Sequence, residues 1–174
     1  MESVKRLKLE SSRLILEPIS MDYAEVIFQE LTAEITRFMH PKPAENINET
    51  IQFIRDAMRH QENGSDFTFV ILKKDNSEFL GVCGVHRINT DTPELGIWTK
   101  KSAHGHGYGR EAIHCLKTWV DELIEYQYLL YPVDKRNIPS QKIPESLKGK
   151  PYREYTQLNL SGHTLHVIEY RIYR

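Results

Sequence analysis

The chain has 174 residues, of which 40% are apolar, 27% charged and 10% aromatic. That length predicts one domain over residues 1–174, and the composition excludes disordered, collagen-like and low-complexity chains. The net charge of −1 argues against a general nucleic-acid binder. No apolar run approaches the roughly 18 residues of a membrane span, and residues 1–12 lack the apolar core of a signal peptide. With its 2 cysteines, the protein is expected to be cytoplasmic and away from membranes.

Charge is unevenly distributed along the chain. From Tyr131 to the end there are 8 Lys and Arg against 4 Asp and Glu, a balance of +4, and the rest has 15 against 20, a balance of −5. Lys135, Arg136 and Lys142 lie in this basic last quarter, close to Asn137. The quarter could receive a compact anion, although ordinary scatter of surface charge explains it equally well.

Periodicity and turn residues predict eleven elements in chain order: a strand at 13–17, a helix ending at Leu31, a helix from Asn48 to Gly64, strands at 68–72, 79–88 and 94–99, a helix through 112–120, a strand at 126–131, a short helix at 138–147, and strands at 154–160 and 165–173. Asn48 is the predicted N-cap of the second helix, and Ser161-Gly162 the predicted tight turn of the last hairpin. This order predicts an α/β (α+β) fold with a single mixed, largely antiparallel sheet flanked by helices.

The segment after the strand at 94–99 carries the clearest chemical signal. Glycines alternate in His104-Gly105-His106-Gly107-Tyr108-Gly109, and a helix follows. Glycine permits a positive φ and a close ligand, and N–H groups at a helix N-terminus attract anions. The segment therefore fits a pyrophosphate, although glycine-rich loops also serve only to turn corners. It has neither the Gly-Lys-Ser/Thr of a P-loop nor the G-x-G-x-x-G spacing of a dinucleotide site.

This segment resembles the acetyl-CoA loop of the GCN5-related N-acetyltransferases (GNAT), which reads Gln/Arg-x-x-Gly-x-Gly/Ala. The chain is most similar to the branch with the RimJ/RimL ribosomal-protein acetyltransferases. Three further motifs match in order: Arg13-Leu14-Ile15-Leu16-Glu17-Pro18, Glu94-Leu95-Gly96-Ile97-Trp98 and Asn137-Ile138-Pro139-Ser140. Each motif alone is unspecific, but the four together span nearly the whole chain and are specific.

The resemblance implies a GNAT fold with strands splayed at an acetyl-CoA site, between the strands at 94–99 and 126–131. It implies direct transfer of the acetyl group to a primary amine through a ternary complex. The N–H groups from Gly105 to Gly109 would hold the pyrophosphate. The backbones of Ile97, Trp98 and Thr99 and the side chain of Asn137 would bind the pantetheine arm. The basic residues beside Asn137 would attract the phosphates of CoA, or form only a solvated rim.

Glu94 and Ser140 are the candidate catalytic residues. Acetyl transfer needs a neutral amine and a way to discharge the thiolate. Glu94 is the candidate base, acting through water, or is only a solvated carboxylate. Ser140 matches the family position whose hydroxyl reaches the thioester sulfur. Alternatively, Ser140 only caps or starts a short helix, and Asn137 is only a turn residue. His104 replaces the family's Gln or Arg, and Pro144 replaces the tyrosine that protonates the thiolate in many relatives.

Other functions stay open at this level. A CoA-binding sensor or interaction domain would keep the loop without turnover, as the loss of the tyrosine allows. A nucleotide enzyme is disfavoured because the P-loop lysine is missing. No metal is expected, since neither His104 with His106 nor His163 with His166 has a third ligand at the usual spacing. The sequence does not choose among a protein N-terminus, a polyamine, an antibiotic and a metabolite as acceptor, and it leaves the oligomeric state open, a homodimer included.

Overall fold

The computed structural model of the chain describes residues 7–174, so the expectation for residues 1–12 lies partly outside the described residues. Its centre is one eight-stranded sheet in the order β1-β2-β3-β4-β5-β6-β8-β7. From β1 to β8 the strands are Leu9–Glu10, Leu14–Pro18, Phe67–Lys73, Phe79–His86, Glu94–Thr99, Leu129–Asp134, Lys150–Leu158 and Thr164–Ile172. Neighbouring strands pair antiparallel except β5 and β6, which are parallel. The predicted mixed, largely antiparallel sheet is confirmed.

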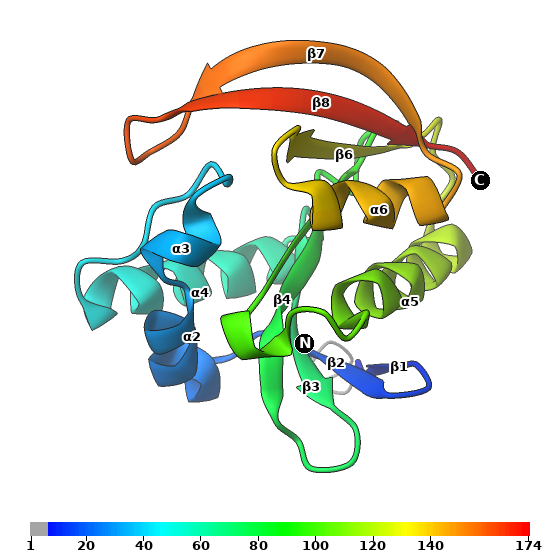
Figure 1. The fold of residues 1–174 in the computed structure, drawn as a ribbon. Helices are drawn as coiled ribbons and strands as arrows, with labels where there is room; N and C mark the ends of the chain where they lie inside the picture. The colour runs from blue at the N-terminus through cyan, green and yellow to red at the C-terminus, as the bar shows by residue number, and fades with distance from the viewer. Residues whose placement is uncertain (1–6) are drawn as a thin grey trace.

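Helices lie on both faces of the sheet (Figure 1). One side carries η1 (Met21–Tyr23), α2 (Ala24–Glu30), α3 (Ala33–Thr36) and α4 (Ile47–Glu62), and the other carries α5 (Tyr108–Leu123) and α6 (Ile138–Ser146). The short η2 (Lys101–Ala103) follows β5. We call these two sides the α4 face and the α5 face. Within residues 7–174, no helix combines the length and apolar character that crossing a membrane requires.

Each face of the sheet has its own apolar core, and the cores fix which way the strand residues point. Ile97 and Tyr131 belong to the core under α5, and Trp98 to the core under α4. Successive side chains of a strand point to opposite faces. Glu94 on β5 and Asp134 on β6 therefore lie on the α4 face, and Tyr131 lies on the α5 face.

The predicted N-cap of the second helix and the predicted start of the strand at 126–131 are wrong. Asn46, rather than Asn48, caps α4: its backbone is extended, and its side chain accepts the N–H of Asn48 at 3.0 Å. The strand predicted at 126–131 is β6, which begins three residues later. Tyr126 lies in the connection before the strand, where its hydroxyl bonds to the carboxylate of Asp121 near the end of α5.

The last hairpin is wider than the predicted Ser161-Gly162 turn. β7 ends at Leu158, and the side chain of Asn159 closes the turn by accepting the N–H of His163 at 2.8 Å. The strand predicted at 154–160 therefore begins and ends too late. Sequence analysis also missed β1, α3 and η2, which are too short to show a hydrophobic period.

Candidate functional site

Strands β5 and β6 separate in the middle of the sheet. Within the described chain they pair at one position, Glu94 with Leu130, where the Leu130 N–H also donates to the carbonyl of Pro93 at 2.8 Å. This pair lies at the amino-terminal end of β5, and beyond it the two parallel strands no longer pair. Their carboxyl ends lead to the glycine loop and to Asn137. From Leu95 to Thr99, β5 pairs with β4 alone. The other edge of β5 is available to bond an extended ligand, and we call this opening the splay.

A glycine in β4 allows β5 to lie where it does. A Cβ on Gly81 would fall 2.2 Å from the carbonyl oxygen of Trp98 and 2.7 Å from the Cα of Thr99. These are backbone atoms, which cannot swing aside as a flexible side chain can. Gly81 is thus required by the close approach of β4 to the end of β5, next to the splay.

The predicted glycine loop lies at the open end of the splay. Gly105 and Gly107 have φ values of 80° and 76°, in the left-handed region that other residues rarely adopt, and Gly107 is the N-cap of α5. Among residues 7–174, no acceptor receives the N–H groups from Gly105 to Gly109. Together with the dipole of α5, these free donors form a site suited to an anion.

Arg13, which precedes β2, ties this loop to the sheet. Its Nε donates to Glu111 Oε2 at 2.6 Å, its Nη1 donates to the carbonyl of His106 at 3.0 Å, and its guanidinium lies 4.6 Å from the Tyr108 ring centroid. Burial acts to raise the pKa of Glu111, but hydrogen bonds from Ser11 and from Arg13 lower it below its usual value. Sequence analysis placed Arg13 in a strand motif and assigned it no role, because its partner is remote in sequence.

His104 fastens the other end of the loop. Its Nε2 lies 2.9 Å from the carbonyl oxygen of Thr99. A carbonyl only accepts hydrogen bonds, so Nε2 carries the proton. The side chain that replaces the family's Gln or Arg thus holds the loop to the end of β5. The ring of His106 packs 5.5 Å from that of Tyr108, and the described residues contain no group of three or more His, Cys, Asp or Glu suited to a metal ion.

The motif Asn137-Ile138-Pro139-Ser140 forms the start of α6, which lies on the α5 face. Asn137 caps this helix by accepting the N–H of Ser140 at 3.4 Å. The Ser140 Oγ lies 2.8 Å from the hydroxyl of Tyr131 on β6. Burial raises the pKa of Tyr131 to about 12, against the effect of the Ser140 hydrogen bond, so the phenol is protonated at neutral pH. No sequence pattern indicates this contact, because the two residues lie on different elements.

Glu94 lies at the closed end of the splay, on the opposite face from Ser140. Its Oε2 is 3.1 Å from Nη2 of Arg87, and its side chain is 36% exposed. The Arg87 N–H in turn donates to Asp66 at 2.8 Å, which holds the arginine beside the strand. The two predicted catalytic residues thus flank the splay from its two faces, and Glu94 is a paired carboxylate in contact with solvent.

A family model described as "Acetyltransferase (GNAT) domain" matches residues 13–150. This chain belongs to the GNAT acetyltransferase family. The acetyltransferase is similar to the uncharacterized N-acetyltransferase p20 of Bacillus licheniformis, at 27% identity over 146 residues that cover 80% of this chain and 80% of that protein. With the family established, the chain is an enzyme that transfers an acetyl group from acetyl-CoA to an amine, and a sensor without turnover is not favoured.

Solved structures share the fold of this acetyltransferase. One is the RimL ribosomal L7/L12 alpha-N-protein acetyltransferase in complex with coenzyme A, with a TM-score of 0.85, 16% identity, and coverage of 96% of this chain and 98% of that chain. Another is the Salmonella typhimurium acetyl transferase that modifies the N-terminal serine of the 50S ribosomal subunit protein L7/L12. Its TM-score is 0.82 and its identity 15%, with coverage of 97% and 99%. These likenesses confirm the GNAT fold expected from the motifs.

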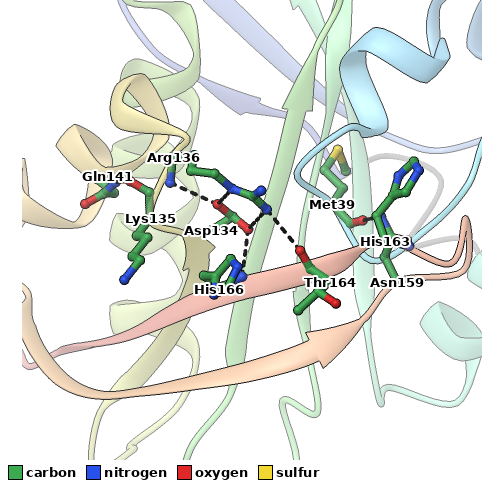
Figure 2. A network of polar contacts seen from close by, with 9 residues as sticks. All are labelled: Met39, Asp134, Lys135, Arg136, Gln141, Asn159, His163, Thr164 and His166. Atoms are coloured by element: carbon green, nitrogen blue, oxygen red, sulfur yellow. Dashed lines mark hydrogen bonds and ion pairs between the residues drawn. The ribbon is translucent and has the colours of Figure 1, made fainter.

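Arg136, one of the three basic residues expected to attract the phosphates of CoA or to form a solvated rim, bonds to Asp134 and to the β7–β8 hairpin. Arg136 donates from Nε and Nη2 to the carboxylate of Asp134, at 2.8 and 2.7 Å, and from Nη2 to the carbonyl of Thr164 at 3.1 Å (Figure 2). Its guanidinium is thereby drawn to the α4 face, away from the glycine loop. Lys135 extends toward Glu154, with Nζ 3.7 Å from the carboxylate.

Proposed function

We propose that this acetyltransferase acts as one domain, with acetyl-CoA bound along the splay and the acceptor amine entering from the α4 face. The observation that carries the proposal is the single pairing of β5 with β6. It leaves one edge of β5 free over Ile97, Trp98 and Thr99, whose backbones are suited to bind the pantetheine arm. Asn137, at the opposite side of the splay, would bind the same arm.

The glycine loop is the proposed pyrophosphate site. The free N–H groups from Gly105 to Gly109 supply donors, and two guanidinium groups lie beside them, that of Arg110 and that of Arg13, which is paired with Glu111. Nη2 of Arg13 and Nη2 of Arg110 lie 3.6 and 3.8 Å from the position that a Cβ of Gly107 would occupy. Anions are favoured where free N–H groups, a helix dipole and cations coincide. The residues present therefore fit the phosphates of acetyl-CoA.

We propose direct transfer without a covalent enzyme intermediate. The amine nitrogen attacks the thioester carbonyl, the carbon–sulfur bond breaks, and CoA leaves as a thiolate. The proton lost by the amine passes through water to Glu94 on the α4 face. An α-amino group, with a pKa of about 7.7–8.0, is neutral far more often than a lysine with a pKa of about 10.4. A solvent-exposed, paired carboxylate is therefore sufficient for an N-terminal amine.

On the α5 face, Ser140 is proposed to donate a hydrogen bond to the leaving thiolate, while Tyr131 positions it. When the Tyr131 hydroxyl donates to Ser140 Oγ across 2.8 Å, the Ser140 proton is free to point to the sulfur. Tyr131 keeps its own proton because burial raises its pKa to about 12. This pair supplies a hydroxyl at the splay, whereas Pro144 stands where many relatives carry a tyrosine.

The proposed acceptor is the α-amino group of a protein N-terminus. Both solved relatives described above are named for modification of the N-terminus of ribosomal protein L7/L12. Proton chemistry supports the same choice, since the site offers Glu94 already paired with Arg87 rather than an isolated, strongly basic group.

Ser140→Ala tests the proposed role of Ser140 in stabilising the leaving thiolate. Ser146→Ala, on the same helix, is the matched control. The measurement is CoA thiol release with a peptide that begins with serine, over a range of acetyl-CoA concentrations. We expect kcat to fall about 100-fold in Ser140→Ala, at the lower end of the usual acid–base contribution, and to hold in Ser146→Ala. Equal kcat values in the two variants would exclude the role of Ser140. Absence of thiol release with every amine tested would exclude the proposed transfer itself.

A further inference from the structure

A hollow on the α4 face is formed by three segments that are far apart in the sequence. It is lined by Arg37 and Phe38 after α3, by Arg136 after β6, and by Gly162, His163 and Thr164 in the turn of the β7–β8 hairpin. We call it the hairpin hollow. The hairpin turn lies over α3 (Figure 1), and Asn159 Nδ2 donates to the carbonyl of Met39 at 3.2 Å (Figure 2). The Leu160 N–H donates to the carbonyl of His40 at 2.9 Å. Hydrogen bonds therefore join the hairpin turn to the segment after α3, which form two sides of the hairpin hollow.

Two guanidinium groups share one aromatic ring in the hairpin hollow. The Cζ atoms of Arg37 and Arg136 lie 5.0 and 4.9 Å from the ring centroid of Phe38, within cation–π range. Glu34, the carboxylate nearest to Arg37 in sequence, pairs with Lys101 instead, at 2.9 Å. Among residues 7–174, no Asp or Glu lies within ion-pair distance of Arg37. One arginine in the hollow is thus without a countercharge.

The second arginine is held in place by a buried carboxylate. Asp134 is 2% exposed and accepts four hydrogen bonds, from the side-chain Nε and Nη2 and the backbone N–H of Arg136 and from the N–H of His166. Burial acts to raise the pKa of Asp134, but these bonds outweigh it and lower the pKa to about 2. Asp134 and Arg136 together are neutral, so the charge of Arg37 leaves the hollow positive.

The hairpin hollow lies on the side of the sheet where the acceptor is proposed to enter. Asp134 ends β6 at the open end of the splay and shares the α4 face with Glu94. We propose that the hollow binds a carboxylate side chain of the acceptor, so that the preferred substrate is a peptide with Asp or Glu close behind its free amino group. This inference rests on the proposed function, because it takes the amine to react in the splay.

A carboxylate suits the hollow on chemical grounds. The planar guanidinium of Arg37 can donate two parallel hydrogen bonds to a carboxylate, and such bidentate pairs are stronger and more specific than single contacts. Arg37 is exposed and oriented by its contact with Phe38, so binding requires little further ordering. The same positive charge repels polycationic acceptors such as polyamines, which narrows the acceptor classes that the sequence left open.

The test compares short peptides that begin with serine and carry one Asp at the second, third, fourth or fifth position with their Asn counterparts. Acetyl transfer is followed as CoA thiol release, and binding is followed separately by fluorescence anisotropy of the same peptides labelled at their carboxyl ends. For at least one position we expect wild-type kcat/KM to favour the Asp peptide about tenfold, as a charge-assisted hydrogen bond provides. Arg37→Gln should bring this ratio close to one, and Arg37→Lys should restore part of it. Arg55→Gln, which changes an exposed arginine of α4 outside the hollow, should leave the ratio unchanged.

The two measurements separate the two proposals. Acetylation of Asp and Asn peptides at equal rates at every position would overturn the carboxylate site and leave acetyl transfer standing. Arg37-dependent binding of Asp peptides without any thiol release would support the site and overturn the proposed transfer. Binding of Asp peptides that Arg37→Gln does not weaken would overturn the site whatever the activity.

Discussion

The two faces of the splay present different kinds of chemical group, backbone N–H groups on one and side chains on the other. On the α5 face the proposed ligand-binding groups are backbone N–H groups from Gly105 to Gly109, fixed by left-handed glycines and by hydrogen bonds from His104 and Arg13. On the α4 face they are side chains, such as Arg37 and Arg136, carried by segments that meet only in the fold. Backbone geometry constrains sequence directly, whereas side chains on loops can change without changing the fold. The groups on the cofactor side can therefore be predicted from the sequence, whereas those on the acceptor side cannot.

β5 separates the two faces, so moving it should disturb both and give the largest effect. Gly81→Ala would place a Cβ 2.2 Å from the Trp98 carbonyl oxygen. We expect the free energy of unfolding, measured by urea denaturation, to fall by about 3 kcal/mol. The control is Gly96→Ala, whose nearest neighbour would be Nε2 of the His86 side chain at 3.4 Å, and we expect a loss below about 1 kcal/mol. Equal losses would contradict a fixed position of β5.

The acceptor face depends on the buried Asp134 carboxylate. A group whose pKa is lowered by folding stabilises the native state above its unfolded pKa, and this stability is lost as the pH falls toward the folded pKa. With a folded pKa of about 2 and an unfolded value of about 3.9, the contribution is about 2–3 kcal/mol. Between about pH 5 and pH 2, the wild type should lose this much more stability than Asp134→Asn.

Urea unfolding at a series of pH values measures this difference. Asp75→Asn, in an exposed turn, is the control and should follow the wild-type curve. If the Asp134→Asn curve also runs parallel to that of the wild type, Asp134 is not the anchor of the hairpin hollow.

The cofactor face should be sensitive to the Arg13–Glu111 pair and insensitive to the acceptor. Glu111→Gln removes the charge that orients Arg13 across 2.6 Å, so the glycine loop loses its tie to the sheet. We expect KM for acetyl-CoA to rise about tenfold, with little change in KM for the acceptor peptide. Glu122→Gln, on an exposed turn of the same helix, is the control. An unchanged KM for acetyl-CoA in Glu111→Gln would contradict a role of the Arg13–Glu111 pair in cofactor binding.

Tyr131 lies on the α5 face and acts only through Ser140, so its removal should have the smallest effect. In Tyr131→Phe, Ser140 keeps its hydroxyl but loses its orienting partner, so kcat should fall about fivefold while both KM values hold. The pH profile of kcat should keep its shape, because Tyr131 does not titrate near neutral pH. Tyr126→Phe is the control, since its hydroxyl bonds to Asp121 on α5. A shifted pH profile, or an unchanged kcat, would contradict a positioning role.

The sequence predicted what local pattern controls. Strand β5, the glycine loop and α5 follow one another in a pattern of alternating glycines and helical period, and the structure has them at these residues. Tertiary contacts decided the rest. Arg136 bonds to Asp134 and to the carbonyl of Thr164 in a distant hairpin, and Arg13 bonds to Glu111 across 98 positions of the chain. No spacing in the sequence announces such partners.

One measurement tests most directly whether the two faces hold different ligands. The dissociation constants of acetyl-CoA and of an Asp-bearing peptide are determined by calorimetry for the wild type, Arg13→Gln and Arg37→Gln. Arg13→Gln should weaken acetyl-CoA about tenfold and leave the peptide unchanged, and Arg37→Gln should do the reverse. If Arg37→Gln weakens acetyl-CoA as much as Arg13→Gln does, the division of the splay into a cofactor face and an acceptor face is wrong.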